Sequence, residues 1–351
     1  MATLKDVARQ AGVSVATASR ALGGYGYVSP ETRSRVLRAA KLLDYHPNAL
    51  ARSMVKKRTH TLGVVVSDNA NPFFAAVVRG IEDVVHQHGY AVVLCNADEN
   101  PEKEEMYLRI LREKRVDGLL LAPSGEAGHF LRAWIREGLP LVLIDRKIEG
   151  IKADAVIVDN RSGAKEAVAH LINLGHRRIA TICGPQRVYT GFERLQGYLE
   201  ALREARIPVK KHLIKEGNFK QDSGYRLARE FLEMDERPTA LFVANNLMTI
   251  GALLALREAG VRIPQEMAVV GFDDMEWASI LTPPLTAVAQ PAYALGVNAA
   301  QLLLQRILRG PSMPPQEIVL KTRLIIRESC GASLHFRPRQ ARQPSVPSRK
   351  F

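Results

Sequence analysis

Beyond Thr61 the chain alternates short, uninterrupted apolar runs with longer amphipathic stretches. The runs are LGVVV from residue 62, AVVLC from 91, GLLLA from 118, LVLI from 141, IATIC from 179, ALFVA from 240 and MAVVGF from 267. A parallel strand that is apolar at every position is buried on both faces, and helices on both sides of the sheet provide that burial. The pattern therefore predicts a doubly wound α/β body. Its length and the break around Asp159 to Gly163 predict two such parallel sheets side by side.

The formal net charge of +13 is concentrated at the two ends of the chain. Residues 1–60 carry +8 and residues 332–351 carry +5, so residues 61–331 are neutral. A basic module attached to a neutral body is typical of a protein in which one part binds a polyanion. The run HFRPRQARQPSVPSRKF is rich in Pro, Arg and Ser and cannot bury a core. We therefore interpret residues 332–351 as a disordered basic tail rather than as a second binding site.

Composition argues against several other classes of protein. The hydrophobic fraction of 46% and the charged fraction of 24% are ordinary for a soluble globular protein, and no apolar run is long enough to cross a bilayer. The N-terminal stretch MATLKDVARQ lacks the features of an export signal, so we expect a cytoplasmic, nucleoid-associated protein without a membrane partner. Cys95, Cys183 and Cys330 are far apart, which fits buried reduced thiols better than disulfides or a zinc site. We expect no metal and no cofactor.

Two short helices are predicted at the N-terminus. Apolar residues recur at i, i+3, i+4 and i+7 from Leu4, and Thr3 is placed as the N-cap of this first helix, which Gly12 ends. Ser14 can cap a second helix that runs to about Leu22, where a pair of glycines breaks the chain. Two short helices joined by a Gly-containing turn are typical of a helix-turn-helix.

A third helix completes an all-α headpiece of residues 1–46. Ser29 is placed as its N-cap and Pro30 at its first position, and the helix is expected to run to about Leu43. A helix pair alone can also be an ordinary helical hairpin. The charge of +8 favours DNA binding instead.

The second helix carries the surface expected to read DNA. Arg20 can make a bidentate contact with guanine, whereas Val15 and Ala16 can read sequence only by packing on thymine methyl groups. Phosphate contacts fix the register without reading sequence, and Lys5 and two hydroxyl side chains of this helix are suited to them. The expected DNA-binding residues of the headpiece are Lys5, Ser14, Val15, Ala16, Thr17, Ser19, Arg20 and Tyr45.

Residues 47–60 are predicted to form a hinge helix and a linker. Pro47 stops the preceding helix and Asn48 can cap ALARSMV, which at two turns is too short to be stable alone in water. If two copies pair over DNA, Leu50 and Met54 can form the contact between the helices and wedge between base steps in the minor groove. The alternative interpretation is a plain basic linker.

The sequence TLKDVARQAGVSVATASRAL, followed by VSPETRSRVLRAAKLLDYHPNALARSM, resembles the headpiece and hinge helix of the LacI family of bacterial transcription regulators, which includes ribose, galactose and purine repressors. The resemblance extends over residues 2 to about 330. It implies a homodimer that binds a near-palindromic operator in double-stranded DNA, with hinge helices that fold on the DNA and insert one side chain at its centre. The family usually has leucine at this position, where this chain has Met54, and often valine where this chain has Ala18.

The regulatory domain of that family resembles the periplasmic sugar-binding proteins. The resemblance implies an effector-binding domain of residues 61–331. Its first subdomain is expected to contain about 61–160 and 292–320, and its second subdomain about 161–289 and 322–331.

Polar and aromatic residues follow the predicted strands at the points where the strands end. In open parallel sheets, ligands bind beyond the carboxyl ends of the strands. Asp and Asn side chains can accept hydrogen bonds from sugar hydroxyls, Arg and Gln can donate to them, and aromatic rings can cover the C–H face of a sugar. The expected effector-binding residues are Asn71, Phe73, Phe74, Asp145, Arg146, Arg194, Phe219, Asn245, Asp273 and Gln290.

Each of these residues also has a purely structural interpretation. An Asp after a strand often caps a helix, Phe73 and Phe74 can be ordinary core residues, and Arg146 can simply pair with Asp145. As a set, the ten are similar, position by position, to the ligand contacts of ribose-binding members of this superfamily, which implies a small-molecule effector that is a ribose-like or other monosaccharide. One departure is Asn246, where sugar binders commonly carry Asp.

The resulting hypothesis is a transcriptional regulator, expected to be a repressor, that a small molecule controls allosterically. The alternative is a regulator of the same family that responds to a non-sugar ligand or to a phosphoprotein. A transport-type sugar-binding protein would have no use for the basic N-terminal module. An enzyme is not expected, because the sequence lacks a G-x-S-x-G elbow, a P-loop and a G-x-G-x-x-G after a strand.

Overall fold

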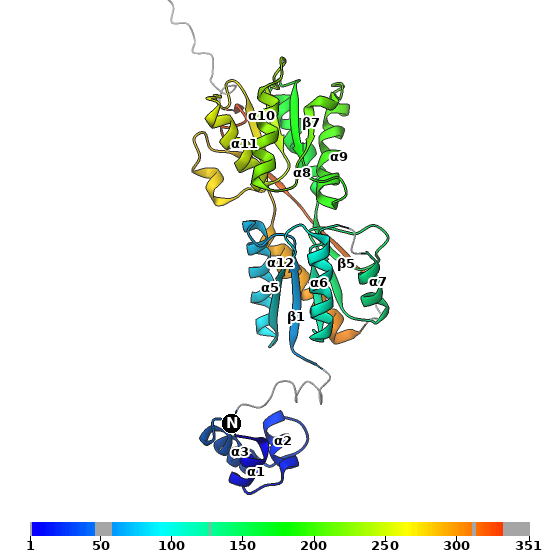
Figure 1. Ribbon diagram of the computed structural model, residues 1–351, viewed down its shortest axis with the longest axis vertical. Coiled ribbons are helices and arrows are strands. Elements are labelled where there is room, and N and C mark those ends of the chain that lie inside the picture. The colour runs from blue at the N-terminus through cyan, green and yellow to red at the C-terminus, as the bar shows by residue number, and fades with distance from the viewer. Residues whose placement is uncertain (1, 46–57, 126–127, 311–313, 333–351) are drawn as a thin grey trace, which may run out of the picture. The chain divides into compact units, whose positions relative to one another are not determined.

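The computed structural model describes residues 2–45, 58–125, 128–310 and 314–332 (Figure 1). Two compact units divide the chain: residues 1–61 together with 114–117 form one, and the remaining residues form the other. No described helix is both long and apolar enough to cross a membrane. The expected hinge helix, and residues 333–351 of the expected tail, lie outside the described residues.

Three short helices make up the N-terminal part of the first unit, which we call the headpiece. They are α1 (Leu4–Gln10), α2 (Val15–Gly23) and α3 (Pro30–Leu42). The three predicted N-caps are confirmed, because the hydroxyls of Thr3, Ser14 and Ser29 accept hydrogen bonds from backbone N–H groups three residues on at 3.4, 3.1 and 3.2 Å. Gly24, with φ of 67°, ends α2 in a left-handed conformation that glycine adopts without strain.

Small apolar side chains fill the interior of the headpiece. Ala18 and Ala21 of α2 are 0% and 4% exposed, whereas Leu22 is half-buried. They pack with buried residues of α1 and α3, among them Val7 and Val36. One face of α2 is therefore committed to this core, and the opposite face is left for contacts with other molecules.

Two six-stranded sheets form the framework of the second unit. Their strand orders are β11-β5-β4-β3-β1-β2 and β12-β10-β9-β8-β6-β7. The strands of the first sheet are β1 (Thr61–Val66), β2 (Ala91–Asn96), β3 (Gly118–Leu121), β4 (Leu141–Ile144), β5 (Asp154–Val158) and β11 (Glu317–Leu320). Those of the second are β6 (Ile179–Cys183), β7 (Ile214–Glu216), β8 (Ala240–Val243), β9 (Ala268–Phe272), β10 (Thr286–Ala289) and β12 (Arg323–Ile325).

Parallel pairing dominates both sheets. In the first sheet β1 pairs with β3, β3 with β4, β4 with β5 and β5 with β11, all in parallel. In the second, β6 pairs in parallel with β7 and β8, β8 with β9, and β9 with β10, whereas β12 runs antiparallel to β10. The core strands β4, β5, β8 and β9 are buried along their whole length, as the apolar runs predict for strands covered on both faces.

Helices cover both faces of each sheet (Figure 1). We call the first sheet with its helices subdomain 1, and the second sheet with its helices subdomain 2. The helices of subdomain 1 are α5 (Pro72–Gln87), α6 (Pro101–Glu113), α7 (Gly128–Arg136) and α12 (Ala292–Arg309). Those of subdomain 2 are α8 (Asn160–Asn173), α9 (Tyr189–Glu204), α10 (Gln221–Leu232), α11 (Asn246–Glu258) and the short 3-10 helices η1 (Lys211–Leu213) and η2 (Glu276–Ser279). The predicted α/β fold with two doubly wound sheets and a helical headpiece is confirmed.

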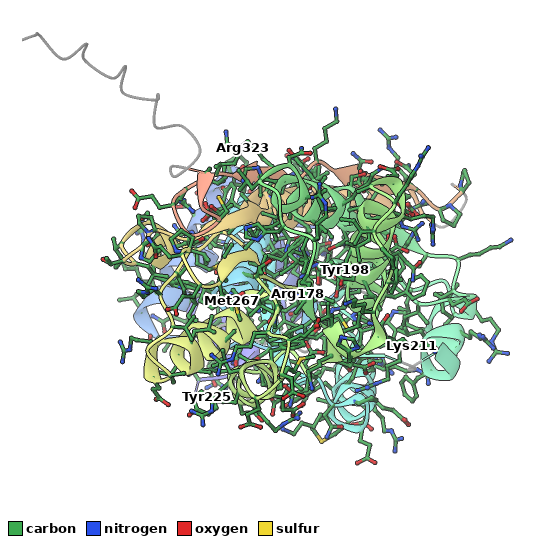
Figure 2. The ribbon with its side chains drawn as sticks, turned by 90° about the horizontal axis from the view of Figure 1, so that it is seen from above. Arg178, Tyr198, Lys211, Tyr225, Met267 and Arg323 are labelled. Atoms are coloured by element: carbon green, nitrogen blue, oxygen red, sulfur yellow. The ribbon has the colours of Figure 1, made fainter. Side chains whose placement is uncertain are left out.

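The two subdomains have separate hydrophobic cores. In subdomain 2 the fully buried Tyr198 of α9 donates a hydrogen bond from its hydroxyl to the carbonyl of Ile179 at 2.8 Å, and Met267 precedes β9 in the same core (Figure 2). In subdomain 1 the helices α5 and α12 touch through their backbones. A Cβ added at Gly296 would lie 2.0 Å from the carbonyl oxygen of Val77, so a side chain there would separate the helices.

The apolar runs misplaced two features of the sheets. They predicted β2 as buried on both faces, but Val93 and Leu94 are 41% and 45% exposed, because β2 is the edge strand of its sheet. They also omitted β5, β7, β10, β11 and β12. Strand β7 is a three-residue edge strand, and β5 begins with Asp154, whose buried carboxylate accepts hydrogen bonds from Arg306 at 2.5 and 2.6 Å.

Candidate functional site

The outer face of α2 carries the residues expected to read DNA bases. Val15, Ala16 and Arg20 are exposed. The Nε atom of Arg20 donates to the carbonyl of Ala16 at 3.3 Å, which orients the guanidinium along the helix. This face has one basic and two apolar side chains available for a major groove.

Other headpiece residues expected to contact DNA already have partners within the protein. The hydroxyls of Ser14 and Thr17 lie 2.9 Å apart within the cap of α2. Ser19 is half-buried, and its hydroxyl lies 2.5 Å from the hydroxyl of Tyr25, a residue that the sequence did not single out. Tyr45 packs against the headpiece core, whereas Lys5 is exposed. Asn48, Leu50 and Met54 lie outside the described residues.

A cavity lies between the carboxyl ends of the two sheets. All ten residues expected to bind an effector line it, and they come from both subdomains. Asp68, Glu99 and Thr190 also line it and were not among the predicted residues. Asp68 and Glu99 follow β1 and β2, so the rule that ligands bind beyond strand ends points to them as well. Thr190, in the first turn of α9, follows no such rule.

Two amide side chains at the cavity cap helices. Asn71 is the N-cap of α5 and accepts from the backbone N–H of Phe73 at 3.0 Å. Asn245 is the N-cap of α11, accepts from the backbone N–H of Met248 at 2.9 Å, and donates to the carbonyl of Phe219 at 3.1 Å. Both residues therefore have a structural role, and both place the positive end of a helix beside the cavity.

Asp145 and Asp273 occupy equivalent positions in the two subdomains. Asp145 directly follows β4 and Asp273 directly follows β9. Strand β4 is third in the order of the first sheet, and β9 is third in the order of the second. Both adopt left-handed backbone conformations, with φ of 64° and 75°, as does Phe219 with φ of 64°. Such conformations are unfavourable for residues with side chains and cluster at functional sites.

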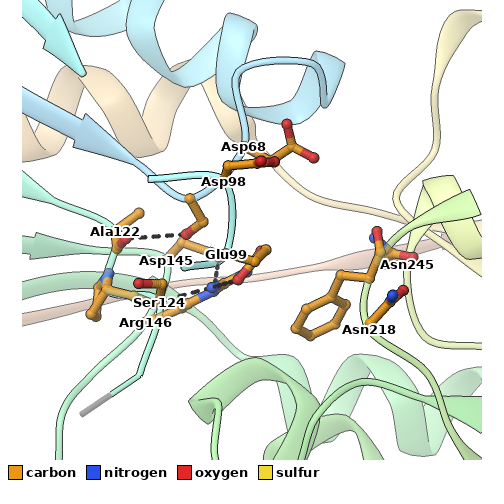
Figure 3. Close-up of polar contacts among 12 residues, drawn as sticks. Asp68, Asp98, Glu99, Ala122, Ser124, Asp145, Arg146, Asn218 and Asn245 are labelled. Atoms are coloured by element: carbon orange, nitrogen blue, oxygen red, sulfur yellow. Dashed lines mark hydrogen bonds and ion pairs between the residues drawn. The ribbon is translucent and has the colours of Figure 1, made fainter. Parts of the chain in front are cut away.

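Glu99, rather than Asp145, is the main partner of Arg146. The two Nη atoms of Arg146 donate to the two carboxylate oxygens of Glu99, both at 2.7 Å (Figure 3). Asp145 lies farther away, with 3.4 Å between its Oδ2 and the Nε of Arg146. The guanidinium also lies over the ring of Phe219, 5.2 Å from its centroid. The Arg146–Asp145 pair of the structural interpretation is present, but it is not the main contact of Arg146.

Arg194 is fixed on the opposite side of the cavity. Its Nε donates to Asn160 at 2.8 Å and one Nη donates to the carbonyl of Ala244 at 2.7 Å, while the guanidinium stacks 3.8 Å from the centroid of Phe272. Burial lowers the pKa of Arg194, and the charges of Asp273 and Asp145 oppose this shift. The geometry holds a buried cation in one orientation.

Several buried polar atoms of the cavity wall lack a hydrogen-bond partner within the described residues. They are Oδ1 of Asp145, Nε of Arg146 and Oε1 of Gln290. Burial also raises the pKa of Asp145 to about 6, although the charge of Arg146 opposes the rise. Buried polar atoms are normally satisfied, so an unpaired set that faces a cavity indicates a polar ligand.

Aromatic rings form the apolar part of the wall. Phe73 and Phe74 make an edge-to-face pair with ring centroids 5.1 Å apart, and both also belong to the hydrophobic core of subdomain 1. The interpretation of these two as core residues therefore holds alongside their place in the cavity wall. Within the part of the chain that the structure describes, no cluster of His, Cys, Asp and Glu is arranged to hold a metal ion.

Comparison with known proteins assigns the chain to a family. Residues 3–48 match the family model "Bacterial regulatory proteins, lacI family", and residues 168–330 match "Periplasmic binding protein-like domain". The HTH-type transcriptional repressor PurR of Vibrio atlanticus (strain LGP32) is 40% identical over 88% of this chain and 92% of its own length.

Two solved structures are similar to this chain, one over nearly its whole length and the other over about three quarters of it. The lac repressor dimer bound to operator and an anti-inducer is 30% identical, with a TM-score of 0.82 over 94% of this chain and 99% of that chain. A LacI family transcriptional regulator from Enterococcus faecium with bound ribose is 32% identical, with a TM-score of 0.69 over 77% of this chain and 98% of that chain. The chain therefore belongs to the lacI family of bacterial regulatory proteins and is a DNA-binding transcriptional repressor.

Proposed function

We propose that the chain acts as a homodimer on a near-palindromic operator, and that a ribose-like monosaccharide bound in the cavity controls its affinity for DNA. The observation that carries the effector assignment is the set of unpaired polar atoms in a small, buried cavity. Two acceptors, on Asp145 and Gln290, and one donor, on Arg146, belong to residues that line this cavity.

A sugar suits this wall because each hydroxyl group both donates and accepts hydrogen bonds. Hydroxyls can donate to the oxygens of Asp145 and Gln290 and accept from the guanidinium of Arg146. The similar regulator from Enterococcus faecium was solved with ribose, which supports the same class of ligand here.

Closure of the cavity on its ligand would change the relative orientation of the subdomains, and in a dimer this alters the spacing of the two headpieces. The ligand controls DNA binding only through its different affinities for the two states, typically a coupling of about 1 to 3 kcal/mol. An inducer weakens operator binding by this coupling and a co-repressor strengthens it.

Operator affinity titrated with D-ribose, other pentoses, hexoses and purine bases tests the proposal. D-ribose is expected to change the affinity by roughly 5- to 150-fold, as a coupling of that size requires. Indifference to every pentose and hexose would refute a sugar effector, and a response to purine bases alone would assign the non-sugar alternative. Retardation of palindromic DNA in a gel-shift assay tests the DNA-binding part independently.

A variant pair tests the role of the cavity wall. Gln290→Leu removes an acceptor and is expected to weaken D-ribose binding about tenfold, because a sugar hydroxyl would then lack its partner. Gln221→Leu, at an exposed position of α10, is the matched control and is expected to bind as the wild type does. Isothermal titration of both variants measures the difference, and equal affinities would refute the contact.

A further inference from the structure

One lysine joins the two subdomains through a contact with Asp68, which lines the cavity. The Nζ atom of Lys220 donates to Oδ2 of Asp68 at 2.6 Å and to Oδ1 of Asp98 at 2.7 Å. Lys220 precedes α10 of subdomain 2, whereas Asp68 and Asp98 follow β1 and β2 of subdomain 1. The two carboxylates lie side by side on the subdomain 1 side of the cavity (Figure 3).

We propose that Lys220 is a positioning residue that latches the two subdomains closed and thereby sets the affinity for the effector without touching it. This inference rests on the proposed function for its effect on effector binding. The latch itself is a property of the chain alone.

The electrostatics of this contact differ from those of an ordinary surface ion pair. A single ammonium group faces two carboxylates, and the side chain of Asp68 is only 6% exposed. Water screens the attraction between Lys220 and the buried Asp68 less than it screens an exposed ion pair, so the contact is stronger than an ordinary surface pair. The hydrogen bonds to Lys220 lower the pKa of Asp98, as a persistent contact with a cation does.

The latch is built into the same turns as the cavity wall. Asp98 and Glu99 are consecutive residues with left-handed φ of 56° each, and they point in different directions: Asp98 to Lys220 and Glu99 to Arg146. On the other side, Lys220 directly follows Phe219, which lines the cavity. A shift of either turn therefore displaces a cavity residue and a latch residue together.

Neighbouring backbone contacts hold the subdomain 1 side of the latch rigid. The side-chain oxygen of Asn96 accepts from the backbone N–H groups of Asn69 and Asp98 at 3.0 and 3.3 Å, and the N–H of Glu99 donates to the carbonyl of Ser67 at 2.7 Å. The loops after β1 and β2 thus move as one body. A second, uncharged contact crosses the cavity where Asn246 donates to Asn71 at 2.8 Å.

The test compares Lys220→Met with Lys165→Met in the full-length protein. Lys165 also makes a 2.6 Å ion pair, but with Glu204 of the same subdomain, so its loss does not affect closure. Hydrogen–deuterium exchange is measured without sugar in peptides covering residues 66–71 and 96–100. Lys220→Met is expected to raise exchange there about three- to tenfold, in proportion to the loss of a charged hydrogen-bonded pair, and Lys165→Met to leave it unchanged.

Asp98→Asn removes the opposite side of the latch and is expected to raise exchange in the same peptides. In the double variant with Lys220→Met the two effects are expected to be non-additive, because both variants remove the contact between Lys220 and Asp98; Lys220→Met also removes the contact with Asp68. Exchange that matches the Lys165→Met control in both single variants would overturn the latch, whatever the sugar does.

Isothermal titration with D-ribose provides the second readout. Lys220→Met is expected to raise the Kd about three- to tenfold, because a smaller fraction of the protein is in the closed, binding-competent state. Lys220→Arg is expected to restore most of the affinity. If the wild type ignores D-ribose while Lys220→Met still opens the cleft, the effector assignment is wrong and the latch stands.

Discussion

Asp145 combines several features that lower the stability of the folded protein. Its backbone is left-handed, its side chain is 4% exposed, and one carboxylate oxygen lacks a hydrogen-bond partner within the described residues. Burial raises its pKa to about 6 even beside the cation of Arg146. A side chain that lowers stability and faces a cavity is typical of residues kept for binding.

Replacing Asp145 with Asn is expected to stabilise the protein above pH 6. The unfolded carboxyl group ionises near pH 4, whereas the folded one keeps its proton to about pH 6, so wild-type stability falls as pH rises between these values. The difference of about two pKa units corresponds to a gain of up to roughly 3 kcal/mol for Asp145→Asn. Thermal unfolding at pH 4 and pH 7 measures it. A gain of the same size at both pH values, or in the exposed control Asp235→Asn, would contradict the assignment.

Arg20 is expected to set specificity for one base pair in each half-site. Arg20→Ala is expected to weaken operator binding by about 1 to 3 kcal/mol per half-site and to relax the preference at that position. Fluorescence anisotropy with operators varied at each base pair measures both effects. Lys5→Gln is the control, expected to weaken binding to all sequences about equally. An unchanged base preference in Arg20→Ala would refute its role in reading bases.

At the scale of elements, side-chain caps decide where the headpiece helices begin. The caps of α2 and α3 are chemically the same, with Ser14 and Ser29 each bonded to the backbone N–H of a threonine. The two capped helices differ in their expected role, because α2 alone is expected to enter a major groove with its exposed face.

This pair of equal caps provides a matched experiment. Ser14→Ala and Ser29→Ala are each expected to destabilise the headpiece by about 1 kcal/mol, the usual value of a lost N-cap. Only Ser14→Ala is expected to weaken operator binding beyond the effect of that destabilisation. Unfolding curves and operator titrations of both variants test this, and equal losses of affinity would argue against α2 as the reading helix.

At the scale of the whole molecule, charge separates two tasks. The first 60 residues carry +8, and residues 61–331, which contain the cavity, are neutral overall. The cavity wall carries two arginines and four carboxylates, so it has no attraction for a polyanion. The basic N-terminal residues are therefore expected to supply the electrostatic contribution to operator affinity.

Removal of residues 332–351 is expected to leave DNA binding unchanged, although it removes five positive charges. The slope of log affinity against log salt counts the phosphates contacted, so the truncated and full-length chains are expected to give the same slope. Lys5→Gln, by contrast, is expected to reduce the slope by about one. A shallower slope after truncation would show that the tail binds DNA.

The sequence by itself determined the local features of this protein. Helix ends follow from caps within three or four residues, such as Thr3 and Gly24, and buried strands follow from continuous apolar runs. Eight of the ten cavity residues were found because parallel strands bring their carboxyl ends to one edge, so sequence position after a strand translates into position in space. Arg194 and Phe219 do not follow a predicted strand.

Only the tertiary structure decided which of these side chains meet. Glu99 and Arg146 are 47 residues apart, and Lys220 and Asp68 are 152 apart, and no local pattern pairs them. The exposure of β2 depends likewise on its place at the edge of a sheet, which an apolar run does not encode. The physical reason is that caps and periodicities act over a few residues, whereas ion pairs and edges depend on how distant segments pack.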